Sequence, residues 1–212
     1  MEPLREVEGT AAPLMRANVD TDVIIPMGRL LRAARDELGR YAFEPLRYRE
    51  DGSENPDFVL NQPAFRDAPI LLGGRNFGCG SSREMAVWAI KGMGIRCVIA
   101  PSFGTIFQNN CFQNSVLPIE LPEETVEAMA AEAREGGANA RFTVDLAANH
   151  ITCPSGRTIA FEVMAARREA LLEGLDDIGM TMRRADAIAT FQARDRTARP
   201  WIHDVDIDGT AG

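Results

Sequence analysis

The stretch from Arg75 to Glu84, which reads RNFGCGSSRE, constrains the fold of this chain more than any other. A short apolar run, Pro69–Gly73, precedes it, and a run typical of a helix, Met85–Lys91, follows it. A strand, a glycine-containing turn and a helix start are therefore expected in this order. Such an arrangement can hold an anion, because the first N–H groups of a helix lack internal partners and the helix dipole is positive there.

The two common glycine motifs for nucleotides do not fit this stretch. The dinucleotide-binding pattern requires a third glycine where this sequence has Arg83, and the phosphate loop requires a lysine where it has Cys79. The turn therefore suits a small anion, with the guanidinium of Arg83 as a fork for a carboxylate. Cys79 is expected to be a small buried thiol beside the turn, with a nucleophile or a metal ligand as alternatives.

Ser81 has a structural interpretation as well as a chemical one. Ser81 and Glu84 form the S-x-x-E pattern of a capping box, in which the serine caps the helix and performs no chemistry. Both interpretations can hold together, because a capping position also points the side chain at the mouth of the turn.

Length and charge narrow the class of protein. A chain of 212 residues suits one soluble domain with extensions. The formal net charge of −8 argues against nucleic acid as a partner, because phosphate contacts need a basic face. No apolar run approaches the length of a membrane span, and the N-terminus lacks the apolar core of a signal peptide. We therefore expect no membrane partner and a cytoplasmic location.

The cysteines and histidines predict no metal site in this chain. No two of the four cysteines have C-x-x-C spacing, and only His150 and His203 could assist them. A zinc ion or an iron–sulfur cluster held by this chain alone is therefore not expected. Free thiols fit a reducing compartment.

The segment before the central stretch carries a second group of polar residues. Asp20, Thr21 and Asp22 precede a β-branched run that ends at Pro26, which predicts a turn entering a short strand. These residues are either turn residues or the edge of an active site. Calcium is a third alternative that lacks the other positions of an EF-hand loop.

The remaining pattern predicts an α/β domain with a mixed sheet. One helix is expected over residues 29–38. After the central stretch the predicted strands are 96–100, 116–120, 141–146, 151–153 and 158–162, and the predicted helices are 103–113, 122–135, 165–173 and 184–194. A single domain is expected over residues 1–195, followed by a polar, mobile C-terminal tail over residues 196–212.

Several motifs resemble one known family. Asn76–Glu84 resembles the signature of the small subunits of 3-isopropylmalate dehydratase, which are related to the swivel domain of aconitase. The other segments that resemble this family, in family order, are 17–22 with 24–26, 55–61, 98–103, 109–112 and 174–179. The resemblance therefore covers nearly the whole chain.

This resemblance implies a three-layer β/β/α swivelling domain of the aconitase type and a two-chain hydro-lyase. The enzyme would isomerise 2-isopropylmalate, a small dicarboxylate, to 3-isopropylmalate by dehydration and rehydration in leucine biosynthesis. The partner would be a large subunit that bears a 4Fe–4S cluster, and this chain would bind no cofactor and no metal.

The resemblance also implies roles for individual residues. Ser81 would be the catalytic base that takes the proton next to a carboxylate, and Ser82 and Arg83 would hold that carboxylate. Thr21 and Asp22 would lie at the edge of the active site and contribute to substrate binding.

Two departures from the family pattern concern the substrate. Met85 stands where the family usually has a histidine, and Met27, Gly28, Arg29 and Leu30 stand where it often has Lys-Gln-Phe-Leu. In the family this loop selects the substituent of the substrate. A paralogous dehydratase for another alkylmalate or for a methylated C4–C5 dicarboxylate is therefore an alternative, and a non-catalytic anion-binding module is a further one.

Overall fold

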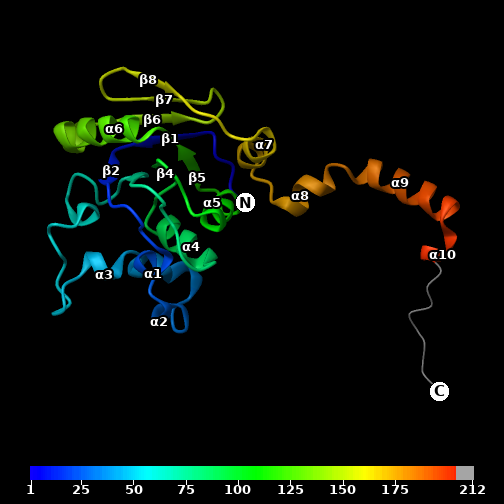
Figure 1. The fold of residues 1–212 in the computed structure, drawn as a ribbon, viewed down its shortest axis with the longest axis horizontal. Coiled ribbons are helices and arrows are strands. Elements are labelled where there is room, and N and C mark those ends of the chain that lie inside the picture. Colours follow the sequence, from blue (N-terminus) through cyan, green and yellow to red (C-terminus); the bar gives the residue numbers. More distant parts are fainter. Residues whose placement is uncertain (204–212) are drawn as a thin grey trace. The chain divides into compact units, whose positions relative to one another are not determined.

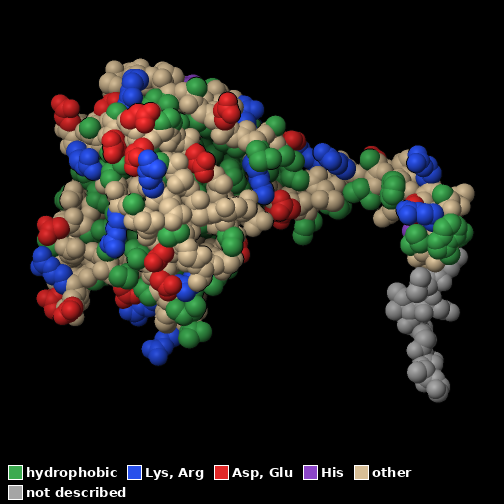
Figure 2. All heavy atoms as spheres, viewed as in Figure 1, with side chains coloured by type: hydrophobic (Ala, Val, Ile, Leu, Met, Phe, Trp, Pro, Cys, Tyr) green, Lys and Arg blue, Asp and Glu red, His purple; other side chains and the backbone are tan. Residues whose placement is uncertain are grey.

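The computed structural model describes residues 1–203 (Figure 1). Its backbone divides into two compact units, residues 1–174 and the residues from Leu175 onward. Figure 2 shows acidic and basic side chains interspersed over the visible face. Among residues 1–203, none of the helices combines the length and the apolarity that crossing a membrane requires.

Two four-stranded sheets lie within residues 1–174. The parallel sheet has the strand order β2 (Ala11–Leu14), β3 (Ile70–Gly73), β4 (Cys97–Ala100), β5 (Leu117–Glu120). The antiparallel sheet has the order β1 (Glu6–Gly9), β6 (Phe142–Asp145), β7 (His150–Thr152), β8 (Thr158–Ala160). The α/β fold class is confirmed, and the two kinds of strand pairing lie in separate sheets.

The parallel strands are mostly apolar, as in a sheet whose two faces are both covered, and only β5 ends in an exposed charged residue, Glu120. Every residue of β2, β3 and β4 is buried. Helices α4 (Glu84–Gly92) and α5 (Thr105–Gln113) connect successive strands and contact each other, as expected of right-handed crossovers, which place both helices on one face. Helix α6 (Glu123–Gly136) contacts β2, β3 and β4, and Figure 1 shows it on the side of the antiparallel sheet.

Shorter helices fill the connections of this unit. Between β2 and β3 lie α1 (Thr21–Ile24), α2 (Met27–Leu30), the 3₁₀ helix η1 (Arg35–Tyr41), α3 (Glu44–Arg47) and the 3₁₀ helix η2 (Val59–Asn61). The 3₁₀ helix η3 (Gly137–Asn139) follows α6, and α7 (Ala165–Glu173) ends the unit.

Two predictions for the segment between β2 and β3 are wrong. The strand expected before Pro26 is the helical turn α1, because the Asp20 side chain accepts a hydrogen bond of 2.7 Å from the backbone N–H of Val23 and caps a helix. The single helix expected over residues 29–38 is interrupted at residues 31–34, so α2 and η1 are separate elements.

The second unit contains α8 (Asp177–Met182), α9 (Ala185–Ala198) and α10 (Pro200–His203). The predicted helix over residues 184–194 is present and extends further, and α8 was not predicted. Residues 196–198 and 200–203, which we assigned to the tail, belong to α9 and α10, and residues 204–212 of that tail lie outside the described residues. The domain boundary at residue 195 stays a prediction, since the contacts divide the chain after Gly174.

Candidate functional site

The turn after β3 is bound to the segment that precedes α1. The backbone N–H of Thr21 donates to the carbonyl of Cys79 over 2.9 Å. The Thr21 hydroxyl donates to the carbonyl of Ser81 over 3.1 Å, and the Thr21 side chain is buried. The two polar groups that the sequence separates by 60 residues are therefore joined in one site.

The same turn is also bound to the segment that follows β4. The backbone N–H of Phe77 donates to the Ser102 carbonyl over 3.0 Å, and Gly104 N–H donates to the Phe77 carbonyl over 2.9 Å. Because β3 and β4 are adjacent parallel strands, both turns lie at the carboxyl edge of the sheet, where open α/β sheets bind ligands.

Glycine is required at Gly78 and Gly104 for this close approach. Gly78 has φ +70°, and a Cβ atom there would lie 2.1 Å from the Phe107 ring. A Cβ atom at Gly104 would lie 2.5 Å from the carbonyl oxygen of Gly78. The glycines of the central stretch thus serve backbone packing.

Ser81 does not cap the following helix, so the capping-box interpretation is wrong. Helix α4 begins at Glu84, and its N-cap residue is Arg83, whose backbone is extended (φ −123°, ψ 100°). No side chain caps this helix, and Ser81 and Ser82 are both exposed. The two hydroxyl groups stand at the mouth of the turn, just before the first turn of α4.

Arg83 is a buried guanidinium at this site, with a relative exposure of 8 %. It forms an ion pair with Asp22, and the same nitrogen, Nη1, lies 3.5 Å from the carbonyl oxygen of Ile25. Its buried Nε finds no hydrogen-bond partner among the described residues. A buried charged donor set that is only partly satisfied favours an anion beside it.

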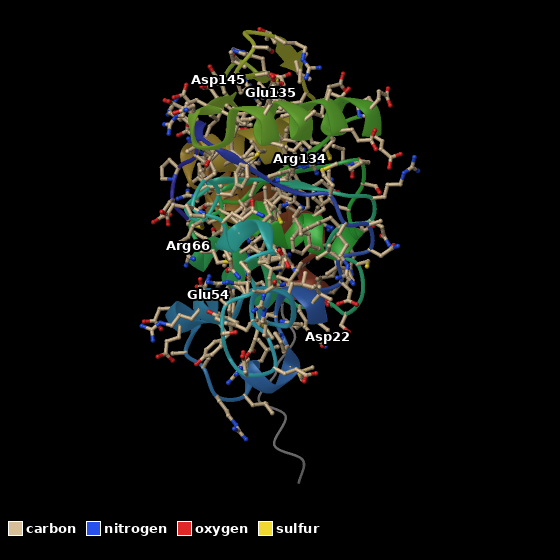
Figure 3. The ribbon with its side chains drawn as sticks, turned by 90° about the vertical axis from the view of Figure 1, so that its left-hand side faces the viewer. Asp22, Glu54, Arg66, Arg134, Glu135 and Asp145 are labelled. Atoms are coloured by element: carbon tan, nitrogen blue, oxygen red, sulfur yellow. The ribbon has the colours of Figure 1, made fainter. Side chains whose placement is uncertain are left out.

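Asp22 is the exposed partner of this ion pair, with a side-chain exposure of 58 %. Figure 3 shows it in the lower half of the view, whereas Asp145 of β6 lies near the top. Thr21, Asp22, Ser81, Ser82 and Arg83 therefore belong to one surface region at the carboxyl edge of the parallel sheet.

The predicted specificity loop is helix α2. Met27 and Gly28 are exposed, and Leu30 is half-buried. Arg29 forms an ion pair with Glu44 of α3, donates to it from Nε over 2.8 Å, and stacks 4.6 Å above the ring of Tyr41. The positive charge of Arg29 is thus neutralised by Glu44 of the same segment.

Asn114 is a buried residue that the sequence analysis did not assign to the site. Its side-chain oxygen accepts hydrogen bonds from Trp88 Nε1 (2.9 Å) and from Arg35 Nη2 (3.1 Å). Its side-chain nitrogen donates to Glu84 Oε1 over 2.9 Å and to the Asn110 carbonyl. Asn114 therefore fixes the first turn of α4, and an asparagine at a helix end gives no sequence signal for such a network.

The cysteines do not gather into a ligand set. Within residues 1–203, no three His, Cys, Asp or Glu side chains are close enough together to hold a metal ion. Cys97 and Cys111 are buried, and burial raises their pKa well above the ordinary thiol value. Cys79 is half-buried, and its pKa is raised by burial and, secondarily, by the charge of Asp20. The described residues thus do not fit an iron–sulfur cluster.

Comparison with known proteins identifies the family. Residues 1–124 match the model of the aconitase C-terminal domain, and residues 177–205 match the model of the C-terminal domain of the 3-isopropylmalate dehydratase small subunit. The 3-isopropylmalate dehydratase small subunit of Rhodospirillum centenum is 56 % identical over 201 residues, which cover 95 % of this chain and 98 % of that protein. The chain belongs to the 3-isopropylmalate dehydratase small-subunit family.

Other members of the family agree with this assignment. The small subunit of Paramagnetospirillum magneticum is 54 % identical, over 95 % of this chain and 100 % of its own length. The crystal structure of 3-isopropylmalate dehydratase from Methanocaldococcus jannaschii is 26 % identical, with a TM-score of 0.63, and the match covers 87 % of this chain and 98 % of that one. The resemblance of Asn76–Glu84 to this small-subunit family is thereby confirmed. Membership of a small-subunit family implies a large-subunit partner.

Proposed function

We propose that this chain is the small subunit of a two-chain enzyme that isomerises 2-isopropylmalate to 3-isopropylmalate by dehydration and rehydration, in leucine biosynthesis. The observation that carries the proposal is the site itself. Exposed Ser81 and Ser82 adjoin the buried guanidinium of Arg83 at the carboxyl edge of the sheet, in a chain of this family.

Arg83 and Ser82 bind a carboxylate of the substrate in this proposal. A guanidinium presents five donors, and the donors of Arg83 are only partly used by Asp22 and Ile25. An incoming carboxylate shares the guanidinium with Asp22, whose exposed side chain has room to turn aside. Thr21 positions Ser81, because its hydroxyl donates a hydrogen bond to the backbone carbonyl of Ser81.

Ser81 removes the proton next to that carboxylate. A serine hydroxyl is a poor base unless its anion is stabilised. Two sources of positive potential lie beside it: the charge of Arg83, and the N–H groups in the first turn of α4. No side-chain cap bond occupies those N–H groups, so they remain available to stabilise an anion at the start of α4.

The other half of the site belongs to the large subunit. A 4Fe–4S cluster on that partner would supply a Lewis acid for the hydroxyl group of the substrate. This chain contributes the base, Ser81, and the guanidinium of Arg83, which binds the carboxylate. Each chain alone therefore holds only half of the site and is inactive in this proposal.

The α2 loop suits an alkyl substituent. Arg29 is paired with Glu44 and stacked on Tyr41, so its charge is already engaged. The other side chains of the loop, Met27 and Leu30, are apolar. An isopropyl group would find apolar surface there. The relative kcat/KM for 2-isopropylmalate and for a malate with a methyl substituent separates this substrate from that of a paralogous dehydratase.

Reconstitution tests the proposed function. The purified chain is mixed anaerobically with the cognate large subunit, and dehydration is followed by the absorbance of the unsaturated intermediate. We expect activity only from the mixture. Ser81→Ala should lower kcat by about 100-fold or more, with assembly intact. Ser82→Ala, the matched change one residue on, should act mainly on KM. Near-full turnover by Ser81→Ala would refute the base assignment.

Calorimetry addresses the non-catalytic alternative. An anion-binding module should bind 2-isopropylmalate tightly without the large subunit, and the mixture should show no turnover. In our proposal the isolated chain binds this acid weakly, because half of the site is missing.

A further inference from the structure

The helices from Leu175 onward have no core of their own. No side chain of residues 175–203 is buried, and every residue of α9 except Asp195 is exposed. Isolated helices of this length are marginal in water, because most helical stability in proteins comes from packing an apolar face. A further surface must cover these helices if they are to persist.

Six large apolar side chains in this segment are exposed, and four of them form pairs within a helix. They are Ile178, Met182, Ile188, Phe191, Trp201 and Ile202. Ile178 and Met182 are four residues apart on α8, and Ile188 and Phe191 are three residues apart on α9, so each pair shares a helix face. Figure 2 shows hydrophobic side chains on the surface of this segment. Such spacing is the pattern by which a helix inserts into a groove of a partner.

We propose that residues 175–203 form a docking arm that binds the large subunit of the dehydratase through these six apolar side chains. The proposal rests on the proposed function, because it takes the large subunit as the partner. Phe191 and Trp201 are the residue types that are enriched at the centres of protein interfaces.

The family models indicate why the large subunit is the occupant. Residues 1–124 match a domain that is named as the C-terminal part of a longer protein, aconitase. The model named for the C-terminal domain of the separate small subunit covers residues 177–205. A separate subunit lacks a covalent link to its partner and needs additional binding surface. The helices that have no core of their own thus lie outside the aconitase match, in the region that the dehydratase models cover over residues 127–165 and 177–205.

The test measures assembly of the full chain with the cognate large subunit. The double variant Ile188→Ala/Phe191→Ala removes two apolar anchors and keeps helix propensity. Gln192→Ala on the same helix is the matched control. By anaerobic sedimentation velocity, the double variant should raise the Kd at least tenfold and the control should leave it unchanged. Hydrogen exchange should show amides 185–198 protected only when the wild-type chain is bound.

Each result decides between this proposal and its competitors. An unchanged Kd for the double variant would overturn the docking arm, as would protection of amides 185–198 in the lone chain, where the helices pack on their own chain or on a second copy. An active complex with an unchanged Kd would leave the proposed function intact. A wild-type complex that forms through this segment but lacks dehydratase activity would refute the proposed function and retain the docking arm.

Discussion

The hydroxyl of Thr21 donates a hydrogen bond of 3.1 Å to the backbone carbonyl of Ser81, which lies 60 residues later in the chain. This bond joins the segment before α1 to the mouth of the central turn. Because the Thr21 side chain is buried, it acts on the position of Ser81.

Replacement of Thr21 by valine should therefore reduce catalysis through Ser81. Valine keeps the shape but lacks the donor, and the loss of about 1.4 kcal/mol corresponds to a kcat lower by about tenfold. Thr21→Ser retains the hydroxyl and should recover most of the rate. Steady-state kinetics of the reconstituted enzyme measure both. A valine variant that changed KM alone would show that Thr21 binds substrate directly.

Gly78 should tolerate no side chain. Gly78→Ala combines a left-handed backbone with a Cβ atom 2.1 Å from the Phe107 ring, so we expect the free energy of unfolding to fall by about 3 kcal/mol. Gly156→Ala is the control for the backbone alone, because Gly156 has φ +83° and nothing within 4 Å of an added Cβ atom. It should cost about 1 kcal/mol. Equal losses in urea unfolding would contradict the steric argument.

Short apolar runs in the sequence correctly predict the buried strands of this fold. The apolar runs Ile70–Gly73 and Cys97–Ala100 are bounded by glycine and proline, and both are buried parallel strands. The run over residues 23–25 is also apolar, yet the Asp20 side chain caps the segment as a helix. A short apolar run fits either element, so the capping bond decides.

The site residues depend on contacts that no local pattern contains. The sequence marks Ser81, Ser82 and Arg83 as neighbours, and the resemblance adds Thr21 and Asp22. The S-x-x-E pattern fails because Arg83 is held in an extended conformation at the helix start, with its side chain paired to Asp22. Asn114, at the end of α5, joins Arg35 of η1 to Glu84 and Trp88 of α4, which only the folded chain brings together.

The thiols should differ in reactivity according to their burial. Burial raises the pKa of Cys79, Cys97 and Cys111, but only Cys79 is partly accessible. Iodoacetamide should modify Cys79 first, at a rate that rises with pH through and above the ordinary thiol pKa, because the thiolate is the reactive form. Mass spectrometry of the native chain measures the sites. Cys79→Ser should abolish the early label, and early modification of Cys97 would contradict the burial described here.

Asn114 should stabilise the start of α4, because this one side chain makes hydrogen bonds with Arg35, Glu84 and Trp88. Asn114→Leu preserves volume but leaves the donors of Trp88 and Arg35 and the carboxylate of Glu84 without their partner. An unpaired buried polar group costs about 1–3 kcal/mol. Glu84 and Trp88 are half-buried and Arg35 is exposed, so we expect the free energy of unfolding to fall by about 2 kcal/mol. Because α4 supplies the positive potential beside Ser81, kcat should also fall at temperatures well below unfolding. Asn139→Leu, at an exposed position, is the control for both measurements. If Asn114→Leu lowered stability but left kcat unchanged, the network would support the fold alone and α4 would keep its position without it.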